Sequence, residues 1–188
     1  MKKQNKKLII ALTGHPSSGK GEVAKYLGEK YGAELLKFST VLRDELNRLC
    51  LPAARKNFII MSECLREHFG QDILAKVISE DIKKSHANII IVDGARREAD
   101  LKYIKKSKKF HLINVNTNPK IRYQRQMLRR EKPDDAKKTF KQFLKEQKSV
   151  SDKDVDILIK KAYITLDNNG TMDQLHQQID ALMKKVVK

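Results

Sequence analysis

Short apolar runs alternate along the chain with longer segments in which apolar residues recur at helical spacing. The runs at 7–13, 34–38, 88–93, 110–116 and 162–167 are mostly continuous, which is typical of strands buried on both faces. The remaining segments predict helices over 19–31, 40–49, 52–85 (two helices broken near Gly70), 98–106, 119–130, 135–148, 152–160 and 171–187. Strands that alternate with helices predict an α/β fold with a five-stranded parallel sheet covered on both faces.

The length of 188 residues fits one domain with a sizeable core, and no linker composition or repeat divides it. We therefore expect a single domain over 1–188. The apolar runs are far shorter than the roughly 18 residues that a membrane span needs. Cys50 and Cys64 form no ligand or disulfide framework, and the five histidines lack metal-binding spacing. The interpretation is a cytoplasmic protein with reduced thiols and no membrane partner.

The net charge of +17 arises from 40 Lys and Arg against 23 Asp and Glu. Such an excess favours anionic partners such as nucleotides, coenzymes or nucleic acid. Most of the cations, however, are lysines spread along several predicted helices. A solvated lysine-rich surface is therefore the preferred interpretation, and nucleic acid is not favoured as a partner.

The stretch GHPSSGKG lies between the first predicted strand and the first predicted helix. Gly14, Gly19 and Lys20 fit the phosphate-binding pattern G-x-x-x-x-G-K-[ST], but Gly21 stands where the Ser or Thr that ligates Mg²⁺ is usual. Backbone N–H groups of such a loop point at an anion, and the helix that follows adds its positive end. We expect Gly14, Pro16, Ser17, Ser18, Gly19, Lys20 and Gly21 to form a phosphate cradle in which Lys20 reaches the β- and γ-phosphates.

Arginine is scarce beside lysine, so its positions indicate where bidentate phosphate binding is needed. Arg122, Arg125 and Arg129 have i, i+3, i+7 spacing and share one helix face. Phosphoryl transfer requires cations around the transferring group, and a mobile arginine-bearing segment can bring them in and exclude water. We interpret these three residues as catalytic.

Two further segments follow predicted strands. IIIVDGARR ends a buried strand at Asp93, where a carboxylate beside a phosphate loop can orient water bound to Mg²⁺ or cap the next helix. Arg96 follows at once and could hold an acceptor phosphate. In KFSTVLRDE, Ser39 or Thr40 can cap the helix that carries Arg43.

With these segments placed, the chain resembles P-loop nucleoside monophosphate kinases. GHPSSGKG resembles the adenylate kinase loop, although Glu22 stands where that family usually has Thr. FSTVLRDEL resembles the start of the acceptor-binding region, LREHFGQDILAKVI with IIIVDGARREADLKYI resembles the deoxynucleoside monophosphate kinase branch, and RYQRQMLRREKPDD resembles its lid. AYITLDNNGTMDQLHQQI resembles the closing strand, turn and helix, with Tyr163 in place of an Asp.

The resemblance implies a three-layer P-loop NTPase fold with strand order 2-3-1-4-5, a helical acceptor-binding region at about 39–86 and a small lid at about 122–149. It implies transfer of the γ-phosphoryl group of Mg·ATP to a nucleoside or deoxynucleoside monophosphate. ATP-binding would include Glu22 and Asn168 besides the cradle. The acceptor would contact Ser39, Arg43, Arg66 and Arg96, and Asp93 would act on Mg²⁺ through water.

Two alternatives remain open. A dephospho-coenzyme A kinase would need a general base near a ribose hydroxyl, and Ser39 and Thr40 stand where that family's acid is usual. A regulatory or RNA-linked P-loop ATPase would use the basic stripe Lys137, Lys141, Lys145 and Lys148, although an ordinary amphipathic helix is the preferred explanation of that stripe. A monomer is the default expectation.

Overall fold

A computed structural model describes residues 7–129, 139–147 and 154–187. The strands are β1 (Leu8–Thr13), β2 (Glu34–Lys37), β3 (Ile89–Asp93), β4 (Phe110–Asn116) and β5 (Ile164–Asp167). The α-helices are α1 (Lys20–Tyr31), α2 (Phe38–Arg48), α3 (Arg55–Phe69), α4 (Ile73–Lys84), α5 (Pro119–Arg129), α6 (Phe140–Gln147), α7 (Val155–Lys160) and α8 (Met172–Val186), and two 3₁₀ segments are η1 (Glu98–Leu101) and η2 (Ile104–Lys106).

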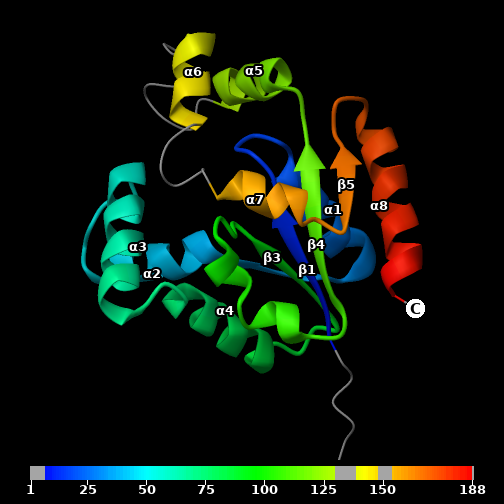
Figure 1. Cartoon of the computed structure of the whole chain (residues 1–188). Helices are drawn as coiled ribbons and strands as arrows, with labels where there is room; N and C mark the ends of the chain where they lie inside the picture. Colours follow the sequence, from blue (N-terminus) through cyan, green and yellow to red (C-terminus); the bar gives the residue numbers. More distant parts are fainter. Residues whose placement is uncertain (1–6, 130–138, 148–153, 188) are drawn as a thin grey trace, which may run out of the picture.

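The five strands form one parallel sheet in the order β2-β3-β1-β4-β5. The α/β class, the parallel sheet and the strand order expected from the sequence are therefore confirmed. Figure 1 shows α1 and α8 on one side of the sheet and α2, α3 and α4 on the other. Within the described residues, no helix is both long and apolar enough to cross a membrane.

The two faces of β1 build two separate cores, because successive side chains in a strand point to opposite faces. Leu8, Ile10 and Leu12 pack with the apolar faces of α1 and α8. Ile9 and Ala11 pack instead with α2, α4 and α7. Burial on both sides explains why β1 has no polar alternation: all six of its residues are buried.

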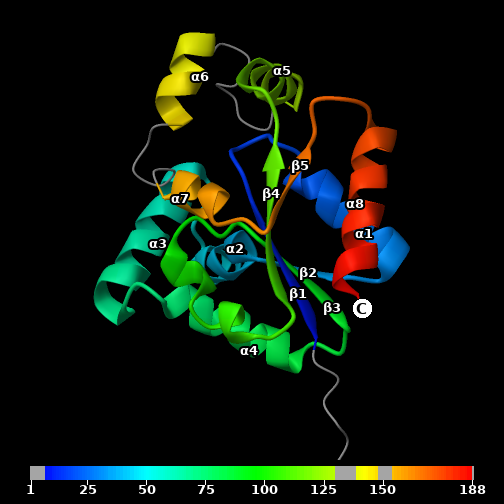
Figure 2. The same cartoon turned by 45° about the vertical axis from the view of Figure 1, so that its right-hand side comes forward.

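The helices α5 and α6 lie beyond the carboxyl end of β4, apart from the helices that cover the sheet (Figures 1 and 2). They pack on each other through Phe143, whose ring is 5.6 Å from that of Tyr123 and is almost fully buried. They belong to the segment expected to form a lid. Residues 130–138 and 148–153 of that segment lie outside the described residues, as do Lys137 and Lys148 of the basic stripe.

Two local predictions are wrong. Residues 98–106 form the short segments η1 and η2 and not one α-helix, because the buried Asp100 carboxylate accepts the backbone N–H groups of Arg96 and Arg97 and tightens the turn. The helix that carries Arg43 begins at Phe38 after the N-cap residue Lys37, so Ser39 and Thr40 lie inside its first turn and do not cap it.

The same Asp100 carboxylate forms a buried ion pair with Arg66. Arg66 Nη2 lies 2.6 Å from Asp100 Oδ1, and the two side chains are 5% and 1% exposed. Arg66 also donates from Nη1 to the Gln71 carbonyl oxygen at 2.6 Å. The pair thus ties α3 to the turn after β3. Every charged group in it has a partner, which is the condition under which a buried ion pair is tolerated.

We predict that Arg66→Met lowers the free energy of unfolding by about 3–5 kcal/mol, because it leaves a buried carboxylate without a counter-ion. Denaturant titration followed by circular dichroism measures the loss. Arg66→Lys is the control and should lose less, since it keeps the charge. A loss from Arg66→Met of under about 1 kcal/mol, as for exposed pairs, would show that Asp100 is not held by this contact.

Candidate functional site

The loop GHPSSGKG joins the carboxyl end of β1 to the first turn of α1. Gly14 and Gly19 have φ of 132° and 98°, a region that residues with a side chain rarely adopt. A Cβ on Gly14 would lie 2.5 Å from the Val115 carbonyl oxygen, and a Cβ on Gly19 would overlap Asn168 Nδ2. These two glycines are therefore required by the backbone itself and by close neighbours. Gly21 is different, because a Cβ there would meet nothing within 4 Å.

Lys20 is the first residue of α1, and its side chain folds back over the loop. Its Nζ donates to the carbonyl oxygens of Gly14 at 2.7 Å and His15 at 3.1 Å. The ammonium group thus lies inside the curve of the loop, at the positive end of a 12-residue helix. An anion bound there would meet the helix end, the loop amides and Lys20 together. Glu22 lies partly buried one turn into α1.

The carbonyl oxygen of Ser18 is the point at which three segments meet. It accepts Asn168 Nδ2 at 2.8 Å and Thr117 Oγ1 at 2.8 Å. Asn168 follows β5, and its backbone N–H donates to the Asn116 carbonyl oxygen at 2.8 Å. Asn168 and Thr117 are 2% and 3% exposed. We call Ser18, Thr117 and Asn168 the Ser18 junction, and it fixes the loop to the ends of β4 and β5.

The sequence pattern singled out Asn168 but not Thr117. The resemblance implied that Asn168 is one of the ATP-binding residues, and its side chain is turned inward onto the loop. Thr117 gives no signal in the sequence, because a threonine after a strand is an ordinary turn residue. Its role in holding the loop is identified only by the hydrogen bond that its hydroxyl donates to the Ser18 carbonyl oxygen in the folded protein.

The expected catalytic arginines of α5 have different surroundings. Arg122 is 3% exposed and donates from Nε to the Thr117 carbonyl oxygen at 3.0 Å and from Nη1 to that of Pro16 at 3.4 Å. Its burial lowers the pKa of its guanidinium. Arg125 donates from Nη2 to the Asn168 carbonyl oxygen at 3.1 Å and is less buried. Arg129 is the last residue of α5, and its side chain lies outside the described part of the structure.

Arg122 therefore anchors α5 to the loop through backbone carbonyls, and Arg125 is the guanidinium placed beside the cradle. A Cβ on Gly19 would lie 3.7 Å from Arg125 Nη1, which shows how close that side chain comes. The spacing i, i+3 predicted that the two residues share one face of the helix, and Arg122 contacts the loop while Arg125 contacts the turn after β5. It could not distinguish a buried anchor from a group at the edge of the site.

Buried polar atoms gather where the loop meets the ends of three strands. Within the described residues, Thr13 Oγ1, Ser18 Oγ, Asp93 Oδ1 and Asn114 Oδ1 are buried without a hydrogen-bond partner. Such atoms are uncommon in folded proteins and indicate a bound ion, ligand or water. Oxygen donors of this kind suit Mg²⁺. The described residues contain no group of three His, Cys, Asp or Glu side chains that could hold a metal ion. Phosphate oxygens would therefore have to complete the coordination of Mg²⁺.

The expected acceptor residues are not all brought together. Ser39 and Arg43 are exposed on α2, with the Arg43 guanidinium 5.9 Å from the centre of the Phe58 ring, and Arg96 is exposed after β3. Arg66 is different: its guanidinium is committed to Asp100, Gln71 and Ser62 inside the protein. A role for Arg66 in holding an acceptor is therefore not supported, because exposing its charge would leave Asp100 unpaired.

The structure also brings Asp156 to the loop, although nothing in the sequence pattern pointed to it. His15 Nε2 lies 3.2 Å from Asp156 Oδ1. Asp156 belongs to α7, which follows the lid segment in the chain and packs beneath it against β1. The phosphate loop is thus contacted from α5, from the β5–α8 turn and from α7.

We predict that Asn168→Asp weakens ATP binding at least about tenfold, because a carboxylate oxygen would replace the N–H that Ser18 needs, at a cost of about 1–3 kcal/mol. Titration calorimetry measures the affinity. Gln177→Glu is the matched control, because it makes the same change from amide to carboxylate at an exposed position of α8, away from the Ser18 junction. Equal losses in both variants would mean that added charge, and not the Ser18 junction, sets the affinity.

Comparison with solved structures agrees with this geometry. A shikimate kinase from Bacteroides thetaiotaomicron superposes with a TM-score of 0.61, covering 96% of this chain and 99% of that one at 13% identity. A shikimate kinase from Acinetobacter baumannii in complex with shikimate gives a TM-score of 0.56, covering 97% and 94% at 14% identity. At such identities the similarity establishes the P-loop kinase-like fold and not the substrate.

Sequence comparison gives the family. A UPF0200 protein of Sulfurisphaera tokodaii is 31% identical over 179 residues, which is 95% of this chain and 97% of that protein. A UPF0200 protein of Pyrococcus abyssi is 27% identical over 186 residues. The family described as "AAA domain" matches residues 13–142, from the end of β1 to α6. The chain therefore belongs to this P-loop family and is a relative of the UPF0200 proteins.

Proposed function

We propose that the protein transfers the γ-phosphoryl group of ATP to a nucleoside or deoxynucleoside monophosphate. The observation that carries the proposal is the geometry of the loop, in which Lys20 Nζ, two left-handed glycines and the start of α1 surround one anion site. A guanidinium from a separate helix, that of Arg125, stands at the edge of the same site. A second cation in this position is what phosphoryl transfer requires around the transferring group.

On the donor side, the loop amides and Lys20 would bind the β- and γ-phosphates of ATP. In this structure the ammonium group of Lys20 donates hydrogen bonds to the carbonyl oxygens of Gly14 and His15. It would exchange these contacts for phosphate oxygens, which are better acceptors because they are charged. The Ser18 junction would keep the loop in place during this exchange, since its hydrogen bonds to the Ser18 carbonyl oxygen do not involve Lys20.

Arg125 would stabilise the group in transfer. Charge builds up on the oxygens around the transferring phosphorus, and a guanidinium held in position stabilises it more than a flexible ammonium does. Arg122 would fix the position of α5 relative to the loop through its hydrogen bonds to the Pro16 and Thr117 carbonyl oxygens. Closure of the lid, proposed at about 122–149, would exclude water and so favour transfer to the acceptor over hydrolysis.

Mg²⁺ bound with ATP would supply charge neutralisation and fix the orientation of the β- and γ-phosphates. Ser18 Oγ and Asp93 Oδ1, buried and without hydrogen-bond partners among the described residues, are the groups that would help to hold it. Asp93 would act through water. Gly21 supplies no hydroxyl, although the space beside it would accommodate one.

The acceptor would enter on the side of α2 and α3, within the proposed region at about 39–86. Arg43 and Arg96, with the hydroxyl of Ser39, are exposed polar groups on that side. A phosphate acceptor is already ionised and needs no general base. Dephospho-coenzyme A or shikimate would present a hydroxyl, for which Asp93 or the exposed Asp44 is the available carboxylate.

The test is release of ADP from Mg·ATP in the presence of ribo- and deoxynucleoside monophosphates, dephospho-coenzyme A and shikimate. We expect one monophosphate to stimulate ADP formation, and Lys20→Ala to abolish it while the unfolding temperature stays near that of the parent. Stimulation only by a hydroxyl acceptor would replace the proposed substrate class. ADP formation that no acceptor increases would indicate an ATPase.

We predict that Arg125→Lys lowers kcat by roughly 10²-fold, the usual effect of removing one donor from a developing charge, and leaves ATP affinity nearly unchanged. Steady-state kinetics with the accepted monophosphate and ATP titration measure the two quantities. Lys120→Arg, the reciprocal exchange at an exposed position of the same helix, should alter neither. Equal loss of kcat and ATP affinity would assign Arg125 to ground-state binding.

A further inference from the structure

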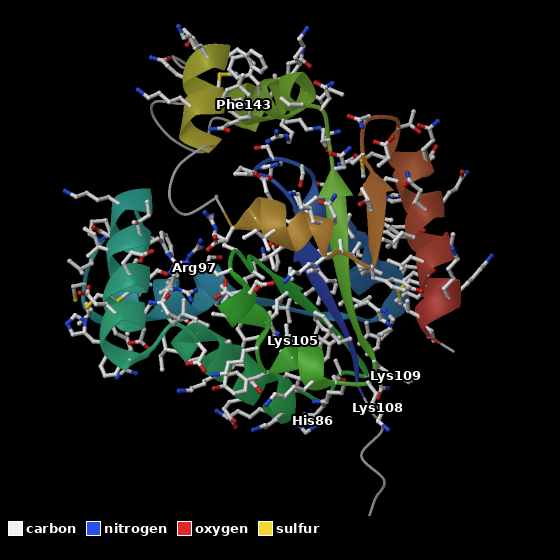
Figure 3. The ribbon with its side chains drawn as sticks, viewed as in Figure 1. His86, Arg97, Lys105, Lys108, Lys109 and Phe143 are labelled. Carbon is white, nitrogen blue, oxygen red and sulfur yellow. The ribbon has the colours of Figure 1, made fainter. Side chains whose placement is uncertain are left out.

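Lysines are concentrated in two loops at the amino-terminal end of the sheet. Residues 102–109 read KYIKKSKK, with five lysines and no acidic residue, and residues 83–88 read KKSHAN. Figure 3 shows His86, Lys105, Lys108 and Lys109 at this end of the molecule, away from α5 and α6. We call Lys84, His86, Lys105, Lys106, Lys108 and Lys109 the amino-end surface.

The strand order brings these two loops together. Residues 83–88 lead into β3 and residues 102–109 lead into β4, and both strands flank β1. The Leu8 N–H donates to the Asn88 carbonyl oxygen and the Ile9 N–H to that of Lys109, each at 2.9 Å. Strands lie about 5 Å apart, so the loops are separated by about 10 Å. Segments distant in the sequence thus form one continuous basic surface.

Three acidic residues near this surface form ion pairs with lysines outside it: Asp72 with Lys102 and Lys76, Glu80 with Lys83, and Glu98 with Lys161. Glu34, which accepts from Ser85 Oγ, and Asp81 lie beside Lys84 and His86 and reduce the positive charge at that edge. Throughout the described ranges, Lys84, Lys106, Lys108 and Lys109 form no ion pair. In α1, by contrast, lysines alternate with Glu22 and Glu29. The surface is therefore a local concentration of charge and not the average of a lysine-rich chain.

This charge cannot serve the phosphate loop. The loop lies at the carboxyl end of β1 and the amino-end surface lies at its start. A strand of six residues spans about 20 Å, which is twice the Debye length of about 10 Å at 0.1 M salt. An anion that the surface attracts is consequently a second partner, distinct from the nucleotide of the proposed reaction.

The residues between the lysines indicate the chemistry of that partner. Ser85, Asn88 and Ser107 are polar, and neither loop contains a large exposed hydrophobic residue. Stable attachment to a membrane surface usually combines cations with inserted apolar side chains or a lipid anchor, and these segments offer no exposed apolar side chain for insertion. Lysine, serine and asparagine are instead side chains that commonly contact the sugar and phosphate of a nucleic acid, contacts that carry no sequence information. We propose that the amino-end surface binds the phosphodiester backbone of a nucleic acid, without sequence preference.

The test measures binding of a labelled 20-nucleotide single-stranded RNA, and of DNA of the same sequence, across a range of salt concentrations. The variant replaces Lys105, Lys106, Lys108 and Lys109 by Gln. Each phosphate contact on a single strand contributes about −0.7 to the slope of log K against log [salt], so four lost contacts should make the slope less steep by about 3. Nucleoside monophosphate-dependent ADP formation should stay unchanged, which separates this inference from the proposed function.

A matched variant replaces Lys25, Lys56, Lys120 and Lys160, all exposed and outside the surface, by Gln. It has the same net charge, and we expect it to keep most of the RNA affinity and the salt slope. Equal losses in the two variants would overturn the proposal, because net charge alone would then explain binding. Binding to phosphatidylserine vesicles with none to RNA or DNA would overturn it as well.

Discussion

The carbonyl oxygen of Ser18 is the contact on which the candidate site depends. A phosphate loop is built from backbone amides, so its affinity for an anion is set by how firmly the backbone is held. Asn168 and Thr117 hold it from the ends of two other strands, and both are buried, where a hydrogen bond that is lost leaves an unsatisfied group. Gly19 belongs to the same arrangement, because no side chain would fit between the loop and Asn168.

The parallel sheet separates two kinds of positive charge. At its carboxyl end, Lys20 and Arg125 donate hydrogen bonds to backbone carbonyl oxygens. A small number of cations held in this way suits a site for one small anion. At its amino end, lysines are numerous and mostly exposed, which suits an extended polyanion. Because every strand runs in the same direction, the two ends do not mix, and one small protein can have two anionic partners.

The arginines illustrate how one residue type can have unrelated roles. Arg66, Arg122 and Arg125 look equivalent in the sequence. Arg66 neutralises a buried carboxylate, Arg122 is an anchor whose pKa is lowered by burial, and Arg125 stands at the edge of the cradle. The difference arises from depth and partners. Helical spacing reports only the side of the helix on which a residue lies.

The sequence by itself determined the class of fold, the strand order through resemblance, and the phosphate loop. These follow from local rules: continuous apolar runs form buried strands, and two glycines with a lysine form a cradle for an anion. Only the tertiary structure decided that α2 begins at Phe38 and that residues 98–106 do not form an α-helix. It also decided that Thr117 and Asp156 reach the loop. Those features depend on contacts between residues far apart in the chain, which no local pattern encodes.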